Sequence, residues 1–163
     1  MSASKNRIDV HYHIIPEPYV EALNRRGIRG SAAVDFPKWS VKRALSAMDR
    51  AGVATAITSL SSPGVQFGDQ AFARELTRTS NEYQARMKVD HPGRFGAFAF
   101  LPLPDVEGSL LELEHAMDVL GHEGVVLLSD TQGRYLGDPA YEELVAELDR
   151  RAAVVFIHPH TEP

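Results

Sequence analysis

The chain has 163 residues, of which 44% are hydrophobic and 24% charged, the composition of a soluble globular chain of single-domain size. It contains no cysteine, which excludes a disulfide framework, a thiol nucleophile and any cysteine-ligated metal site. The formal net charge of −5 and the lack of a basic run argue against a nucleic-acid partner. The longest apolar run, residues 152–157, is far too short to cross a membrane, and no secretory leader is visible, so a cytoplasmic protein is expected.

Short β-branched runs alternate with amphipathic helical stretches along the whole chain. Most of these runs are continuously apolar, as in strands that are buried on both faces of a parallel sheet. Ser40, Asp69, Asp105 and Asp138 are predicted to cap helices, and Gly52 is predicted to end the first of them. The predicted strands are Ile8–His13, Ala54–Leu60, Arg94–Leu101, Gly124–Ser129 and Ala153–His158.

Two architectures accommodate five parallel strands. A doubly wound, flavodoxin-like sheet of about 150 residues fits the length, but no glycine-rich phosphate loop follows the first strand. A (β/α)₈ barrel needs about 250 residues, so this chain would hold its first five strands. No helix follows the last strand to cover it. The sequence therefore favours a partial (β/α)₈ barrel, one domain over residues 1–163 that is incomplete at its carboxyl end.

Three histidines are predicted to share the carboxyl edge of this sheet. His11 and His13 are two apart in the first strand and so project from the same face, and His158 ends the fifth strand. Three converging imidazoles would form an open site for a divalent metal such as zinc. The alternative is one buried and one surface histidine in the first strand, with His158 hydrogen bonded to a backbone carbonyl.

Other side chains are interpreted by their position along the chain. His115 lies on a helix flanked by Glu112 and Glu114 and is expected on a solvated face. Loops at the carboxyl side of parallel strands build the pocket in α/β folds. The residues predicted to contact substrate there are Trp39, Phe67, Ser129 and His160.

A series of motifs runs through essentially the whole chain in order. They include residues 9–13 (Asp-Val-His-Tyr-His), 48–53, 91–96, 135–139 and 155–159. This series resembles the amidohydrolase superfamily. The branch that it resembles is that of aminocarboxymuconate semialdehyde decarboxylase and its relatives, the γ-resorcylate and 6-methylsalicylate decarboxylases.

The resemblance implies a (β/α)₈ barrel that binds one divalent metal, usually Zn²⁺. The ligands of the first and fifth strands in that family fall here on His11, His13 and His158. The family takes an aspartate ligand from its eighth strand and a catalytic histidine from its sixth. Both lie outside residues 1–163, so no catalytic residue is predicted within this chain.

The resemblance also implies a metal-dependent, non-oxidative decarboxylase of an aromatic or unsaturated carboxylic acid. Two alternatives stay open: a metal-dependent hydrolase of a lactone, amide or ester on the same scaffold, and an inactive fragment. The expected partner is a small carboxylic acid substrate. Open strand edges further predict a homo-oligomer or a complementing carboxyl-terminal half.

Overall fold

Five parallel strands form the central sheet of the computed structural model, which describes residues 7–31 and 34–160. The strand order is β1-β4-β5-β6-β9, and every adjacent pair is parallel. These strands match the five predicted from the sequence to within two residues at each end. They are β1 (Arg7–His13), β4 (Val53–Ser59), β5 (Phe95–Phe100), β6 (Gly124–Leu128) and β9 (Val155–His158).

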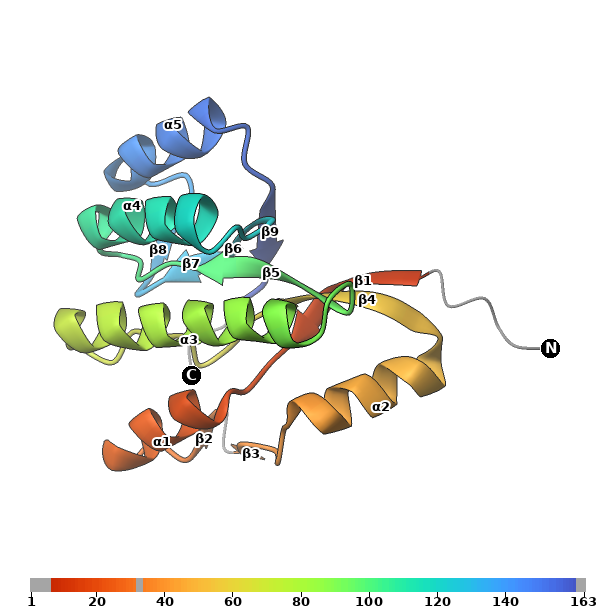
Figure 1. Cartoon of the computed structure of the whole chain (residues 1–163). Coiled ribbons are helices and arrows are strands. Elements are labelled where there is room, and N and C mark those ends of the chain that lie inside the picture. Colours follow the sequence, from red (N-terminus) through yellow and green to blue (C-terminus); the bar gives the residue numbers. More distant parts are fainter. Residues whose placement is uncertain (1–6, 32–33, 161–163) are drawn as a thin grey trace.

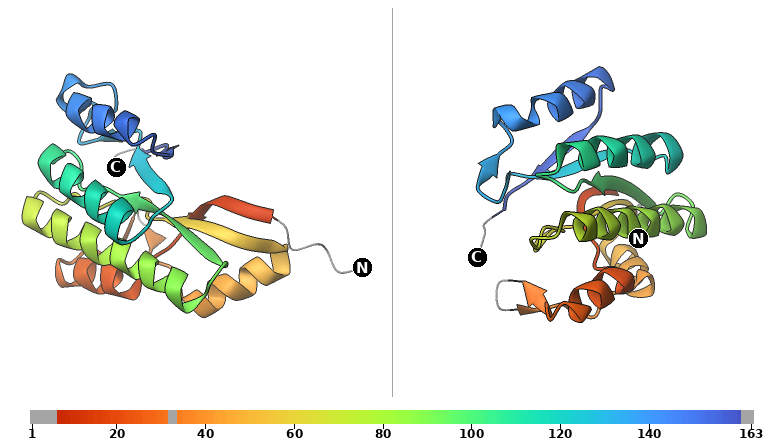
Figure 2. Two further views of the ribbon diagram at one scale, coloured as in Figure 1. Left: turned by 45° about the horizontal axis from the view of Figure 1, so that its top comes forward. Right: turned by 90° about the vertical axis from the view of Figure 1, so that its left-hand side faces the viewer.

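Helices alternate with these strands, and Figure 2 shows α3, α4 and α5 stacked side by side along the sheet. Two short antiparallel ribbons lie in the connections: β2 (Gly30–Ser31) with β3 (Val34–Asp35), and β7 (Asp130–Thr131) with β8 (Arg134–Tyr135). No helix in the described ranges is long and apolar enough to span a membrane. The helices are α1 (Glu17–Arg25), α2 (Val41–Ala51), α3 (Gln70–Asp90), α4 (Val106–Glu114), the π-helical η1 (His115–Val119), the 3₁₀ turn η2 (Pro139–Tyr141) and α5 (Glu142–Arg150).

The predicted helix caps are confirmed. The side chains of Ser40, Asp69 and Asp105 accept hydrogen bonds from backbone N–H groups three residues further on, and Gly52 ends α2 in the left-handed conformation. Asp138 caps the 3₁₀ turn η2, which leads into α5. Helix α1 was not predicted from the sequence. It buries one apolar stripe, which includes the fully buried Leu23.

The sheet is curled, which confirms the partial barrel over the flat doubly wound alternative. The edge strands β1 and β9 are four strand spacings apart, which in a flat sheet is about 19 Å. The ring centroids of His11 on β1 and Phe156 on β9 are nevertheless only 5.2 Å apart. Phe156 also stacks on Phe98 of β5, with ring centroids 5.8 Å apart and planes inclined by 15°. One face of the sheet is therefore concave, and its side chains meet across the interior.

Buried amides on α3 fix this helix to the strands beneath it. The Asn81 side chain donates to the Phe100 carbonyl and accepts from the Phe100 N–H, both at 3.0 Å. The Gln84 side chain donates to the Thr58 carbonyl at 2.8 Å. Because both amides are fully buried, these bonds replace lost contacts with water. They hold the carboxyl ends of β4 and β5 in a fixed register with the helix layer.

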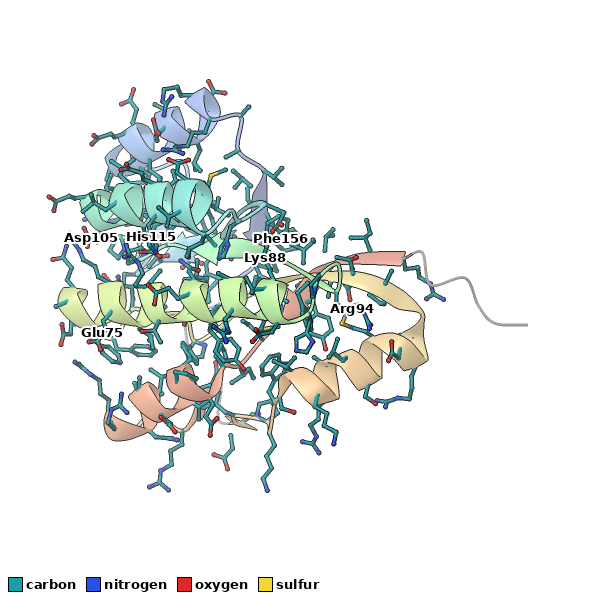
Figure 3. All side chains as sticks on the ribbon, in the orientation of Figure 1. Glu75, Lys88, Arg94, Asp105, His115 and Phe156 are labelled. Carbon is teal, nitrogen blue, oxygen red and sulfur yellow. The ribbon has the colours of Figure 1, made fainter. Side chains whose placement is uncertain are left out.

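The expectation that His115 lies on a solvated face is wrong. Glu112 is buried and accepts from the Arg78 guanidinium at 2.7 Å, because this side of α4 packs against α3. The His115 side chain is only 22% exposed, and its Nε2 lies 3.7 Å from a Glu82 carboxylate oxygen. Figure 3 labels His115 between these helices. The acidic residue Glu112 did not indicate exposure, because Arg78 of α3 pairs with it in the buried contact between the two helices.

His122 makes folding stability depend on pH. It is 5% exposed, and neither ring nitrogen has a hydrogen-bond partner in the described part of the chain. Burial, together with the charge of Lys88, lowers the pKa of His122 to about 4. Between that value and the ordinary value of about 6.5, the unfolded chain binds a proton that the folded chain does not.

Lowering the pH from 7 to 4.5 should therefore reduce the free energy of unfolding of the metal-free protein. His122 alone contributes about 1.4 kcal/mol per pH unit in this window, and His122→Leu should remove that part of the slope. Urea unfolding at several pH values measures it, with His91→Leu at the end of α3 as the control. An unchanged slope in His122→Leu would contradict the assignment.

Candidate metal centre

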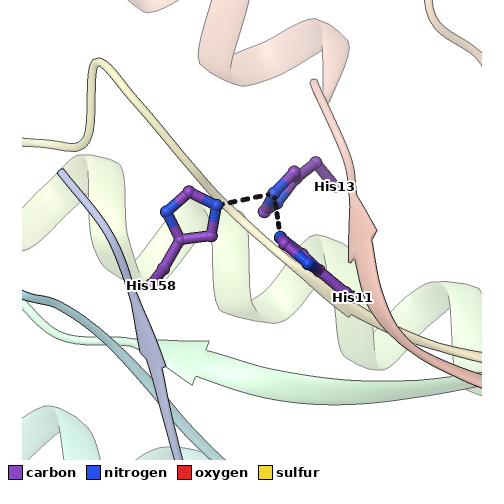
Figure 4. Close-up of side chains that lie close together, drawn as sticks. All are labelled: His11, His13 and His158. Atoms are coloured by element: carbon purple, nitrogen blue, oxygen red, sulfur yellow. Dashed lines mark hydrogen bonds between the residues drawn. The ribbon is translucent and has the colours of Figure 1, made fainter.

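Three imidazoles meet where the first and last strands of the sheet face each other (Figure 4). His11 and His13 come from β1, and His158 ends β9. The Nε2 atom of His13 lies 3.0 Å from Nε2 of His11 and 3.0 Å from Nε2 of His158. One ring nitrogen from each residue lies within 4.8 Å of the others. The structure thus brings together the three side chains that the sequence singled out.

Local features of β1 aim its two histidines at the same point. Strand pairing with β4 is irregular between Asp9 and Tyr12, so the ladder is interrupted beside His11. The backbone N–H of His11 donates instead to the Asp9 side chain at 3.0 Å, which satisfies that group locally. Pairing resumes at Tyr12, and His13 then lies opposite Ser59 of β4.

The tautomer of His158 is fixed by its neighbour. Its Nδ1 lies 2.6 Å from the Pro159 carbonyl oxygen. Since a carbonyl oxygen can only accept, Nδ1 carries the hydrogen and donates it. In the neutral ring Nε2 then holds a lone pair, and this lone pair faces His13. This is the outer-shell arrangement that orients histidine ligands in metal sites.

His13 lies at the centre of the cluster and favours the uncharged form. Burial is the main cause, and the neighbouring His158 and His11 add to it, so the pKa of His13 is lowered to about 4. Its Nδ1 lies 3.3 Å from the Ser59 hydroxyl, which leaves Nε2 toward the other two rings. A neutral imidazole is the form that binds a metal ion.

The donor set fits a divalent cation. A single ring nitrogen makes one hydrogen bond in the plane of its ring, yet His13 Nε2 has two Nε2 neighbours at 3.0 Å. Without a cation, at least one of these two close nitrogen pairs would have no hydrogen bond between its atoms. A cation among the three nitrogens would remove this repulsion, because each lone pair could then bind it. Nitrogens about 2.0–2.1 Å from one tetrahedral zinc ion are themselves about 3.3 Å apart, which is close to the two separations of 3.0 Å at His13.

The four residues predicted to contact substrate divide into two pairs. Ser129 and His160 lie beside His158: the Ser129 N–H donates to the His158 carbonyl at 2.8 Å, and the His160 N–H donates to the Ser129 hydroxyl at 3.0 Å. Trp39 and Phe67 pack against the hydrophobic core instead, next to Tyr83 and Phe72 of α3, respectively. The substrate contacts of all four stay predictions.

Two phenylalanines beside the histidines were not singled out from the sequence. Phe156 lies against His11 and stacks on Phe98, so both rings line the concave face next to the imidazoles. The signal was present for one of them, because Phe156 is two residues before His158 and so shares its face of the strand. Phe98 gave no such signal. Its strand is apolar on both faces, so the sequence does not show which face is concave.

The family model of the amidohydrolases matches residues 8–163. The chain belongs to this amidohydrolase family. Its curled sheet of five parallel strands is that of a partial (β/α)₈ barrel.

Similar proteins are decarboxylases and amidohydrolases about twice as long. The 6-methylsalicylic acid decarboxylase of Aspergillus aculeatus is 38% identical over 157 residues, which cover 94% of this chain and 47% of that protein. The crystal structure of an amidohydrolase II has a TM-score of 0.90 at 33% identity and covers 96% and 51% of the two chains. A 5-carboxyvanillate decarboxylase from Novosphingobium aromaticivorans, complexed with manganese and 4-hydroxy-3-methoxy-5-nitrobenzoic acid, has a TM-score of 0.81 at 25% identity, with coverage of 96% and 51%. The chain thus spans about half the length of these relatives.

Removal of the Ser59 hydroxyl should weaken metal binding by about tenfold, because outer-shell partners of ligating histidines typically contribute that much. Titration of the metal-free protein with Zn²⁺ or Mn²⁺ would compare Ser59→Ala with the wild type. Ser59→Thr retains a hydroxyl and should restore the affinity. Ser46→Ala, whose hydroxyl contacts Arg50 on α2, is the matched control. Equal affinities in Ser59→Ala and Ser46→Ala would contradict a positioning role for Ser59.

Proposed function

We propose that this chain belongs to a metal-dependent, non-oxidative decarboxylase of aromatic carboxylic acids, with the metal held by His11, His13 and His158. The observation that carries the proposal is the meeting of three Nε2 atoms at the carboxyl edge of the sheet. Similarity to the 6-methylsalicylic acid and 5-carboxyvanillate decarboxylases supports the reaction class.

The proposed metal is a divalent transition-metal ion. Three imidazole ligands suit Zn²⁺, the ion that the sequence predicts, whereas the similar 5-carboxyvanillate decarboxylase was crystallised with manganese. When bound, such an ion supplies positive charge that neutralises and orients a substrate carboxylate.

The side chains next to the imidazoles favour an aromatic substrate. Phe156 is 5.2 Å from the His11 ring and parallel to Phe98, which gives the concave face a flat apolar surface beside three polar nitrogens. An aromatic acid has the same division, with a carboxylate on one side and an apolar ring on the other. Offset stacking on such rings contributes about 0.5–1.5 kcal/mol beyond the buried area.

Decarboxylation breaks the bond between the ring carbon and the carboxylate, releases CO₂ and delivers a proton to that ring carbon. The histidines of the cluster would hold the metal, which would supply positive charge for the carboxylate, and Phe98 and Phe156 would line the site beside the ring. The family resemblance places the proton-transferring histidine on the sixth strand, outside residues 1–163.

The purified protein should contain about one divalent metal ion per chain, because three imidazoles converge on one point. His11→Ala and His158→Ala should each lose most of this metal on dialysis, whereas His91→Ala should retain it. Elemental analysis after loading with Zn²⁺ or Mn²⁺ measures the content and the preference. Equal metal content in all four proteins would remove the proposed centre.

With the sixth and eighth strands of the barrel present, the metal-loaded protein should release CO₂ from 6-methylsalicylate or 2,6-dihydroxybenzoate, and His158→Ala should lower the rate at least a hundredfold because it loses the metal. Released CO₂ and the decarboxylated phenol are both quantified, with His91→Ala as the control.

Metal binding by this longer form without CO₂ release from either acid would contradict the decarboxylase proposal. Hydrolysis of a lactone, amide or ester by the same sample would assign the chain to a metal-dependent hydrolase instead.

A further inference from the structure

His158 is held by strand pairing on one side only. It is the last of four residues in β9, which pairs with β6 and has no second neighbour in the described part of the sheet. The ends of such short strands open easily, because few hydrogen bonds hold them. A metal ligand in this position therefore needs support from outside the strand if its ring is to keep one orientation.

Ser129 binds the backbone on both sides of Pro159, the residue that follows His158. Ser129 is the first residue after β6, and its backbone N–H donates to the His158 carbonyl at 2.8 Å. Its Oγ accepts from the His160 N–H at 3.0 Å. Because proline has no N–H, the His160 N–H is the first backbone donor after His158. One serine thus holds both peptide groups that flank Pro159.

A buried carboxylate sets the direction of the Ser129 hydroxyl. The hydroxyl donates to Asp130 Oδ1 at 3.4 Å, and the Asp130 side chain is only 11% exposed. Because the N–H of His160 cannot accept, the hydroxyl uses a lone pair there and keeps its own hydrogen for Asp130. The serine is thereby oriented to accept from the chain that follows β9.

The bond from Ser129 reaches the His158 ring through a single peptide group. The His160 N–H and the Pro159 carbonyl belong to the same peptide group, and this carbonyl accepts from His158 Nδ1 at 2.6 Å. A peptide group is planar, so an acceptor that holds its N–H also fixes the direction of its C=O. Ser129 therefore fixes the carbonyl that turns Nε2 of His158 toward His13.

We propose that Ser129 is a positioning residue for the metal ligand His158 and acts through the peptide group between Pro159 and His160. This role differs from the substrate contact that the sequence predicts for Ser129. It requires the backbone N–H of His160 and not its imidazole ring. The inference rests on the metal centre of the proposed function, but it does not depend on the reaction.

The affinity of the full chain for Co²⁺ tests this role, and the visible absorption of bound Co²⁺ reports the geometry of the site. Ser129→Ala should weaken Co²⁺ binding about tenfold, the typical effect of losing an outer-shell partner. Ser129→Thr keeps a hydroxyl and should restore both the affinity and the wild-type spectrum. Ser109→Ala is the matched control, because it removes a buried hydroxyl on α4 that has no hydrogen-bond partner among the described residues.

Further variants trace the path of the effect. His160→Ala retains the backbone N–H and should keep the wild-type affinity. Ser129→Ala should cause no additional loss in a His158→Ala background, because the ring that it orients is absent. If Ser129→Ala does not fold, Asp130→Ala should weaken binding in the same direction, since it frees the hydroxyl to rotate. Asp130→Asn keeps an acceptor for the hydroxyl and is the control for that variant.

Equal Co²⁺ affinities in Ser129→Ala and Ser109→Ala would overturn the positioning role. A loss in His160→Ala as large as that in Ser129→Ala would also overturn it, because the effect would then belong to the ring. A loss that Ser129→Thr does not restore would indicate a general disturbance of the strand and would have the same consequence. If the wild-type chain binds no Co²⁺, Zn²⁺ or Mn²⁺, the metal centre of the proposed function fails together with this inference.

Discussion

The curvature of the five-stranded sheet is the constraint on which the candidate site depends. Strands β1 and β9 are the two edges of this sheet, with three strands between them. A flat sheet would hold them about 19 Å apart, too far for any shared ligand. Curling brings His13 and His158 to 3.0 Å between their Nε2 atoms. Any change that flattens the sheet would therefore separate the histidines before it affects their own conformations.

Around this cluster, the neighbouring groups orient nitrogen lone pairs inward. The Pro159 carbonyl fixes the His158 tautomer, and the Ser59 hydroxyl lies at Nδ1 of His13. Burial keeps His13 neutral by lowering its pKa to about 4. An uncharged, oriented imidazole binds a cation without a free-energy cost for reorientation or deprotonation. The second layer of contacts therefore matters to the site as much as the three histidines.

The outer surfaces of both edge strands remain apolar and accessible. Ile8 on β1 is 66% exposed and Ile157 on β9 is 59% exposed. Exposed apolar side chains on unpaired edges favour association with further strands or other chains. This agrees with the sequence-based expectation of a homo-oligomer or a complementing half, which stays a prediction.

Sequence alone determined the βα alternation, the helix caps and the three histidines, because each depends on local patterns such as apolar runs, cap residues and two-residue spacing. It did not determine that Phe98 and Phe156 stack beside the histidines or that Glu112 and His115 are enclosed by α3. These contacts join residues between 33 and 58 positions apart, and local spacing carries no record of them. Only the curled sheet, with its helices packed outside, decided which apolar faces are concave and which charges are buried.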